Sequence, residues 1–226
     1  PNTRVSYARR PGENDLVLLE LLEPHSFAED FNDSVIKLIK ALGITRYIQI
    51  GGMYDSVPHS RELSVTGSAR GWEPPEGLGN VRIGKSKYQG PTSMTSQISE
   101  RIFTDLHLET LSLMVHLPLY LKLDDDFAGS ARILKILSEL YGFSTILPEV
   151  EMGEKQYEQV NPAMIDNPQL KDMVERFERE SDTDDGDGRS AIDNGVSLSP
   201  EIEQFLTEIA EGELGSDSDE PESRGE

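Results

Sequence analysis

The chain contains no cysteine and few basic residues, and both absences narrow its function. Without cysteine there can be no disulfide, no thiolate-bound metal and no thiol nucleophile. Lys and Arg number 21 against 42 Asp and Glu, which gives a formal net charge of −21. Proteins that bind nucleic acids or anionic membranes need clustered basic side chains to meet phosphate groups. We therefore expect neither a nucleic-acid partner nor a membrane partner.

Long apolar runs are also missing. The longest, residues 16–22 and 111–121, are interrupted by Glu20 and His116, whereas a membrane-spanning helix needs roughly 20 apolar residues. The first residues lack the apolar core of a secretory signal. These absences predict a cytoplasmic protein.

The negative charge is concentrated near the carboxyl end. Residues 181–226 hold fifteen acidic residues against two arginines, so they carry −13 of the total −21. A segment of this composition buries too little apolar surface to fold alone. We predict an α/β/α domain at 1–147, a helical extension at 148–180, a disordered acidic linker at 181–198, an amphipathic helix at 199–211 and an acidic tail at 212–226.

Within the first domain, hydrophobic periodicity predicts alternating strands and helices. The first helix should begin at a capping box formed by Ser26 and Glu29 and end at a left-handed Gly43. The expected strands are 16–22, 46–50, 81–83, 111–115 and 143–147, and further helices begin at Ser93 and span 127–141. Strand, helix and strand in succession predict two β-α-β units, and hence a mostly parallel sheet.

Two amphipathic helices are expected after this domain. Asn167 and Pro168 supply an N-cap and a first-turn proline for the first of them, and its apolar face holds Leu170, Met173, Val174 and Phe177. The second carries an apolar stripe that could fill a groove on a partner, made of Ile202, Phe205, Leu206 and Ile209. Folding back onto its own domain is an equal alternative for this second helix.

The segment from Tyr47 to Arg61 is a candidate functional site. Its apolar run breaks at Gly51 and Gly52, and glycines after a strand allow a sharp turn or the close approach of a ligand or a neighbouring chain. Ligands collect at the carboxyl ends of strands in open α/β sheets. The alternative is a tight turn followed by an exposed Arg61.

Several motif-like patterns do not fit their required context. Residues 79–86 match the letters of a phosphate-binding loop, but the middle of the pattern is strand-like and Pro91 interrupts any helix after it. Residues 182–188 resemble a calcium loop in the wrong register. No serine lies in a nucleophile elbow. His116 ends a predicted strand without an identifiable partner, and a histidine bonded only to backbone is the more common case. We expect no metal and no cofactor.

The order of several short segments resembles the proteasome assembly chaperone family of the second-subunit type, which has many prokaryotic members. The resemblance extends over residues 15–143 and is carried by residues 16–24, 41–44 with 48–52, 116–118, and 126–128 with the helix up to Gly142. It implies a three-layer α/β/α fold similar to the nucleoside phosphorylase and hydrolase class, with a mostly parallel sheet, self-association, and for some members a role in assembling proteasome subunits.

The two ends of the chain depart from this family pattern. Relatives carry a further strand and helix before the segment that matches Asp15, so we expect the chain to be truncated at its amino end and to lack those strands. Archaeal relatives that dock on proteasomes end with a hydrophobic residue, a tyrosine and one more residue. This chain ends in Gly225 and Glu226, which argues against insertion of its carboxyl terminus into a proteasome pocket.

Two functions remain after these observations. The favoured one is a non-enzymatic assembly protein that self-associates and holds a protein partner, in which a proteasome-related partner is one option. The alternative is an enzyme or small-molecule binder of the phosphorylase-like class. Its ligand cleft, at the carboxyl ends of the strands, would be formed by Gly51, Gly52, Arg61, Gly90 and His116.

Overall fold

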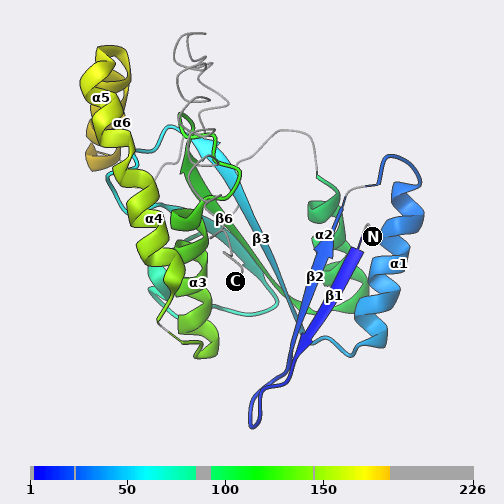
Figure 1. Ribbon diagram of the computed structural model, residues 1–226. Coiled ribbons are helices and arrows are strands. Elements are labelled where there is room, and N and C mark those ends of the chain that lie inside the picture. The colour runs from blue at the N-terminus through cyan, green and yellow to red at the C-terminus, as the bar shows by residue number, and fades with distance from the viewer. Residues whose placement is uncertain (1–2, 23, 85–92, 145, 184–226) are drawn as a thin grey trace, which may run out of the picture. The chain divides into compact units, whose positions relative to one another are not determined.

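The computed structural model describes residues 3–22, 24–84, 93–144 and 146–183 (Figure 1). Its elements, in chain order, are β1 (Thr3–Ala8), β2 (Leu16–Leu21), α1 (Ala28–Ala41), β3 (Arg46–Asp55), β4 (Val65–Arg70), the 3-10 turn η1 (Leu78–Asn80), β5 (Arg82–Ile83), α2 (Met94–Leu106), β6 (Glu109–Pro118), α3 (Phe127–Tyr141), α4 (Pro148–Glu158), α5 (Val160–Asp166) and α6 (Pro168–Thr183). The chain divides into two compact units, and we describe each by itself.

The first unit comprises the described residues up to Gln49 together with 69–73 and 93–111. Its core is formed by one apolar face of each of two helices. The buried side chains are Val35, Ile36 and Ile39 of α1 and Met94, Ile98 and Ile102 of α2. Leu19 and Leu21 of β2 pack against this cluster. The helix predicted to begin at Ser93 therefore buries one apolar face.

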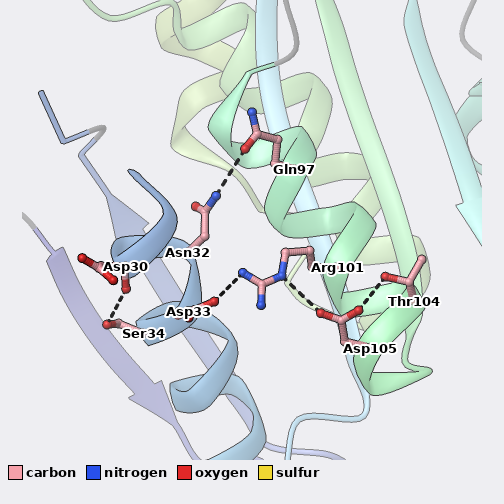
Figure 2. A network of polar contacts seen from close by, with 8 residues as sticks. All are labelled: Asp30, Asn32, Asp33, Ser34, Gln97, Arg101, Thr104 and Asp105. Atoms are coloured by element: carbon pink, nitrogen blue, oxygen red, sulfur yellow. Dashed lines mark hydrogen bonds and ion pairs between the residues drawn. The ribbon is translucent and has the colours of Figure 1, made fainter. Parts of the chain in front are cut away.

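A polar network also joins α1 and α2 (Figure 2). Arg101 of α2 donates to Asp33 of α1 at 2.7 Å and to Asp105 on its own helix at 3.1 Å. Closer to the core, the Asn32 amide donates to Gln97 Oε1 at 3.3 Å, while Asn32 Oδ1 is buried without a hydrogen-bond partner among the described residues. The exposed ion pairs add little stability, so apolar packing holds these helices together.

The start of α1 differs from the sequence prediction. Phe27 occupies the N-cap in a left-handed conformation with φ 58°, and no side chain caps the helix. The capping box predicted at Ser26 is therefore wrong. The predicted end is confirmed, because Gly43 adopts φ +65° directly after the helix.

The first predicted β-α-β unit is also wrong. β2 pairs with β1 in a two-stranded antiparallel sheet, in which Val5 faces Leu19 and Tyr7 faces Val17, and β3 belongs to another sheet. The short connection between β1 and β2 is closed locally: the Glu13 N–H donates to Arg10 O, and the Arg10 N–H donates to Asp15 Oδ1. Closing the short loop of a hairpin costs less conformational entropy than closing a long crossover connection, which favours pairing of β2 with β1.

The second sheet has the strand order β3-β6-β4-β5. Arg46 contacts Glu109 and Gly51 lies against Met114, so β3 and β6 keep a separation of 63 positions, which identifies a parallel pair. The His116 N–H donates to Ser64 O, and Gly67 lies against Ser112 O, so β6 and β4 run antiparallel. β4 and β5 are parallel. The predicted α/β class with a mostly parallel sheet is confirmed, but the second β-α-β unit is wrong, since β5 pairs with β4 and runs opposite to β6.

The second unit comprises residues 50–68, 74–84 and the described residues from 112 onward. Its helices confirm the predicted helix at 127–141, the N-cap at Asn167 and the apolar face of the helix that follows it. Asp126 caps α3 by accepting from the Gly129 N–H at 2.7 Å, and Gly142 ends that helix at φ +64°. Asn167 Oδ1 accepts from the Leu170 N–H at 3.1 Å at the start of α6. Leu170, Val174 and Phe177 of α6 are buried, as its apolar stripe predicted.

Two strands were missed and one was predicted wrongly. β1 and β4 contain small and polar residues that do not alternate clearly with apolar ones. No strand forms at the described residues of 143–147, and α4 begins at Pro148 instead. The acidic linker predicted to begin at residue 181 begins too early, because α6 continues to Thr183. The rest of that linker, the amphipathic helix at 199–211 and the acidic tail lie outside the described residues.

Candidate functional site

Three strands of the second unit bring an aspartate, a histidine and a threonine together. Asp55 is the last residue of β3, His116 lies near the end of β6, and Thr66 lies near the start of β4. His116 Nδ1 is 2.6 Å from Asp55 Oδ2, and His116 Nε2 is 2.9 Å from Thr66 Oγ1. Both nitrogens of one imidazole therefore have side-chain partners.

The chemistry of these partners fixes the proton positions. An ionised carboxylate only accepts hydrogen bonds, so His116 Nδ1 must carry a proton and donate it to Asp55. In the neutral imidazole Nε2 is then an acceptor, and the Thr66 hydroxyl donates to it. Acid, imidazole and hydroxyl in this order form the arrangement in which a hydroxyl can be activated as a nucleophile.

Asp55 and His116 are both buried, whereas Thr66 is partly exposed. The Asp55 carboxylate is held by a second bond, because its Oδ1 accepts from the Ser56 N–H at 2.7 Å. The chain is further fixed where β3 ends, since the Leu119 N–H donates to Asp55 O at 3.0 Å. The acid and the imidazole are thus held inside the protein, and Thr66 is the most exposed residue of the three.

Gly51 and Gly52 do not end a strand. β3 continues through them to Asp55, and side chains from β6 cover the positions where their Cβ atoms would lie. A Cβ on Gly51 would be 3.0 Å from Met114 Cε, and one on Gly52 would be 3.2 Å from Leu117 Cδ1. Of the readings that the sequence allowed, the close approach of a neighbouring strand accounts for both glycines.

The other residues predicted for a cleft have different surroundings. Arg61 is exposed and pairs with Asp182 of α6, with 3.3 Å between its Nη2 and Asp182 Oδ2. Gly90 lies outside the described residues. The structure therefore brings Gly51 and Gly52 onto the same strand as the acid partner of His116, and places Arg61 in an ion pair with α6. A ligand cleft built from all five residues stays a prediction.

A second buried histidine lies close to two tyrosines. The Tyr120 hydroxyl accepts from the His59 N–H at 2.8 Å and lies 2.7 Å from His59 Nδ1, to which it is also hydrogen-bonded. Burial lowers the pKa of His59, against opposing contributions from Asn161 and Glu178. Burial raises the pKa of Tyr120 and that of Tyr157, whose hydroxyl donates to Asp126 Oδ2 at 2.8 Å. This cluster is neutral at ordinary pH.

The sequence prediction missed Asp55 and Thr66 as partners of His116. They lie 61 and 50 positions away, and the bonds depend on which strands are neighbours. Asp55 follows the double glycine, so its proximity to the predicted site was a usable signal. Thr66 gave none, because β4 was not predicted. The described residues contain no cluster of acidic residues and histidines suited to a metal ion, and no helix among them is long and apolar enough to cross a membrane.

Comparisons with known proteins bear on the family and the fold. The model of the PAC2 family matches residues 1–162. No curated protein matches the chain. Solved structures do: a protein of unknown function from Corynebacterium glutamicum has a TM-score of 0.65 at 19% identity, covering 75% of this chain and 62% of that one. One from Mycobacterium tuberculosis, also of unknown function, has a TM-score of 0.65 at 24% identity, covering 87% of this chain and 64% of its own.

A third structure is described as a proteasome-assembly chaperone homologue, also from M. tuberculosis. Its TM-score is 0.64 at 18% identity, over 76% of this chain and 72% of that one. The chain thus spans less than two thirds of the length of the first two relatives. At these identities the structures show a shared fold. The match to the family model extends over most of the chain and confirms the resemblance seen in the sequence, and we conclude that the chain belongs to the PAC2 family.

Proposed function

We propose that this PAC2 protein is a chaperone-like binding protein that acts through protein-protein contacts. Family membership and the fold shared with a proteasome-assembly chaperone homologue support the proposal. A second neighbour, from Pyrococcus furiosus, is described as an archaeal homologue of a proteasome-assembly chaperone and has a TM-score of 0.52. A proteasome subunit is therefore the partner class we propose, together with association of this chain with itself.

The observation that carries the proposal is the exposed apolar surface of the β1–β2 sheet. Val5 and Tyr7 lie on the sheet face that also holds Leu19, yet 46% and 57% of their surfaces are exposed. Among the described residues β1 pairs only with β2, so its outer edge offers backbone groups as well as apolar side chains. A strand with an open edge and an apolar face is a ready site for pairing with another chain.

The test compares two neighbouring substitutions on β1. Successive residues of a strand point to opposite faces, so Val5→Asp charges the apolar surface while Ser6→Asp adds the same charge on the other face. Full-length wild type and both variants are mixed with purified proteasome α-type subunits from the same organism, and complexes are measured by native mass spectrometry. We expect a complex with wild type, weakened about tenfold or more by Val5→Asp and much less by Ser6→Asp.

Light scattering on each protein alone tests self-association in parallel. A drop in oligomer mass for Val5→Asp, with wild-type mass for Ser6→Asp, places the contact between copies on this face. The proposal is overturned if wild type forms no complex with the α-type subunits, or if Val5→Asp and wild type bind them equally well.

A further inference from the structure

We propose that Thr66 is a hydroxyl nucleophile that accepts an acyl group from small esters or thioesters, with His116 as its general base and Asp55 as the positioning residue. This activity is separate from the proposed chaperone-like role, and neither depends on the other. The distances of 2.9 Å from Thr66 Oγ1 to His116 Nε2 and 2.6 Å from His116 Nδ1 to Asp55 Oδ2 carry the inference. Both lie within the range for a nucleophile, its base and the group that orients the base.

The three strands place these side chains on one face of the sheet. Gly51 and Asp55 are on the same face of β3, as shown by contacts of Gly51 with Met114 and of Asp55 with His116 on β6. Gly51 lacks the side chain that would otherwise cover this face. Val65 and Val115 are buried on the opposite face. The polar array therefore lies away from the apolar core, with the partly exposed Thr66 as its outermost group.

Two neighbouring groups could meet the charge that forms during acyl transfer. Arg82 of β5 is the register partner of Thr66, so its Cα lies beside that of Thr66 in the β4–β5 pair. Ser64 precedes β4, and its hydroxyl oxygen is buried without a hydrogen-bond partner among the described residues. A buried hydroxyl without a partner costs free energy that a carbonyl oxygen of a bound acyl group would recover. A cation and a free donor are what a developing oxyanion requires.

The proposed step conserves atoms and charge. Thr66 Oγ1 attacks the acyl carbon while its proton passes to His116 Nε2, and the resulting imidazolium is stabilised by the Asp55 carboxylate. Collapse of the tetrahedral intermediate breaks the bond to the leaving alcohol or thiol, which takes the proton from Nε2. An ester on Thr66 remains, and attack by water through the same imidazole releases a carboxylic acid.

The experiment uses phenylmethylsulfonyl fluoride on the full chain. Its sulfonyl group would form a bond to Thr66 Oγ1 as fluoride leaves and His116 takes the proton. We expect one adduct by intact mass, located on Thr66 by peptide mapping, and labelling that accelerates with rising pH, as general-base catalysis requires. Thr66→Val, which keeps the side-chain shape, and His116→Gln should slow labelling by about 100-fold or more. Thr66→Ser should retain it, and so should the matched control Ser68→Ala on the same strand.

Asp55→Asn tests positioning, because loss of the carboxylate should shift the pH profile of labelling as well as slow it. The site of the adduct on wild type tests the proposal even where a variant fails to fold, because the adduct is either on Thr66 or elsewhere. Wild type without an adduct, an adduct at another residue, or equal labelling of Thr66→Val and wild type overturns the proposal. A lowered melting temperature of Thr66→Val with an unlabelled wild type would show that the array is only structural.

Discussion

His59 and His116 are both buried, but their hydrogen-bond partners differ. Both ring nitrogens of His116 have side-chain partners, Asp55 and Thr66, whereas His59 is hydrogen-bonded to the Tyr120 hydroxyl at Nδ1 and sits beside two aromatic rings. A charged His59 would lose its hydration by water in this buried position. Burial accordingly lowers its pKa below the ordinary value of 6.5.

His59 should therefore make stability fall on acidification. Its pKa is lower in the folded state, so below about pH 6.5 the unfolded state binds more protons and the free energy of unfolding decreases until pH reaches the folded value. We expect the urea midpoint of wild type to drop between pH 7.5 and 5.5. His59→Gln should flatten this dependence, and the exposed control His25→Gln should leave it unchanged. A slope that persists in His59→Gln would assign the effect to other groups.

Arg132 is a buried cation whose guanidinium bonds two backbone carbonyls. Its Nε donates to Leu63 O at 2.9 Å and its Nη2 donates to Gly79 O, which ties α3 to the segment before β4 and to η1. Arg132→Met removes both bonds and leaves two carbonyls unsatisfied, so we expect a loss of about 2–4 kcal/mol in the free energy of unfolding. The exposed Lys135→Met on the same helix is the control. Urea titrations that give equal values for both variants would contradict this role.

At the scale of elements, α4 approaches α3 so closely that one position on it admits no side chain. A Cβ on Gly153 would lie 2.6 Å from the backbone N of Ala128, a contact that a rotamer change cannot relieve. Gln156 of α4 also bonds the backbone at the start of α3. Its Oε1 accepts from the Phe127 N–H, and its Nε2 donates to Asp125 O. The first turn of α3 is thus positioned by α4.

Gly153→Ala tests this packing against helix propensity. Alanine is favoured over glycine in a helix by about 1 kcal/mol, so an open site would gain stability. Here the clash with Ala128 must separate the two helices, and we expect a net loss of about 1–3 kcal/mol. Glu154→Ala, at the exposed neighbouring position, should change stability by less than about 0.5 kcal/mol. A more stable Gly153→Ala protein in thermal and urea unfolding would refute the close contact.

The strands show which elements of this fold a sequence pattern predicts and which it does not. β6 was predicted from its apolar residues, because it is buried in the middle of a sheet. β1 was not, since all six of its residues are exposed and it is held by a local hairpin. Strand boundaries around Gly51 and Gly52 were predicted too short for a related reason: glycine weakens a strand signal, but here it accommodates Met114 and Leu117 from β6. A neighbour in space decided what these glycines do.

At the scale of the whole molecule, the net charge of −21 opposes folding through self-repulsion. Salt screens this repulsion within a Debye length of about 10 Å at 0.1 M. We expect the melting temperature of the full chain to rise by a few degrees between 0.05 and 0.5 M NaCl. Most of the charge lies in residues 181–226, so a variant ending at Thr183 should respond less. An equal or larger salt response of the shorter chain would place the repulsion elsewhere.

Local patterns determined the features that depend on a few consecutive residues. Apolar periodicity and capping residues fixed α2, α3 and α6 because each cap and each helical face is formed within a turn or two, and the order of such segments along the chain indicated the family. Tertiary structure decided the pairing of strands and therefore the site. The bonds of His116 to Asp55 and Thr66 join residues 61 and 50 positions apart. Such contacts depend on which strands are neighbours, and hairpin closure and burial of the whole sheet set that choice.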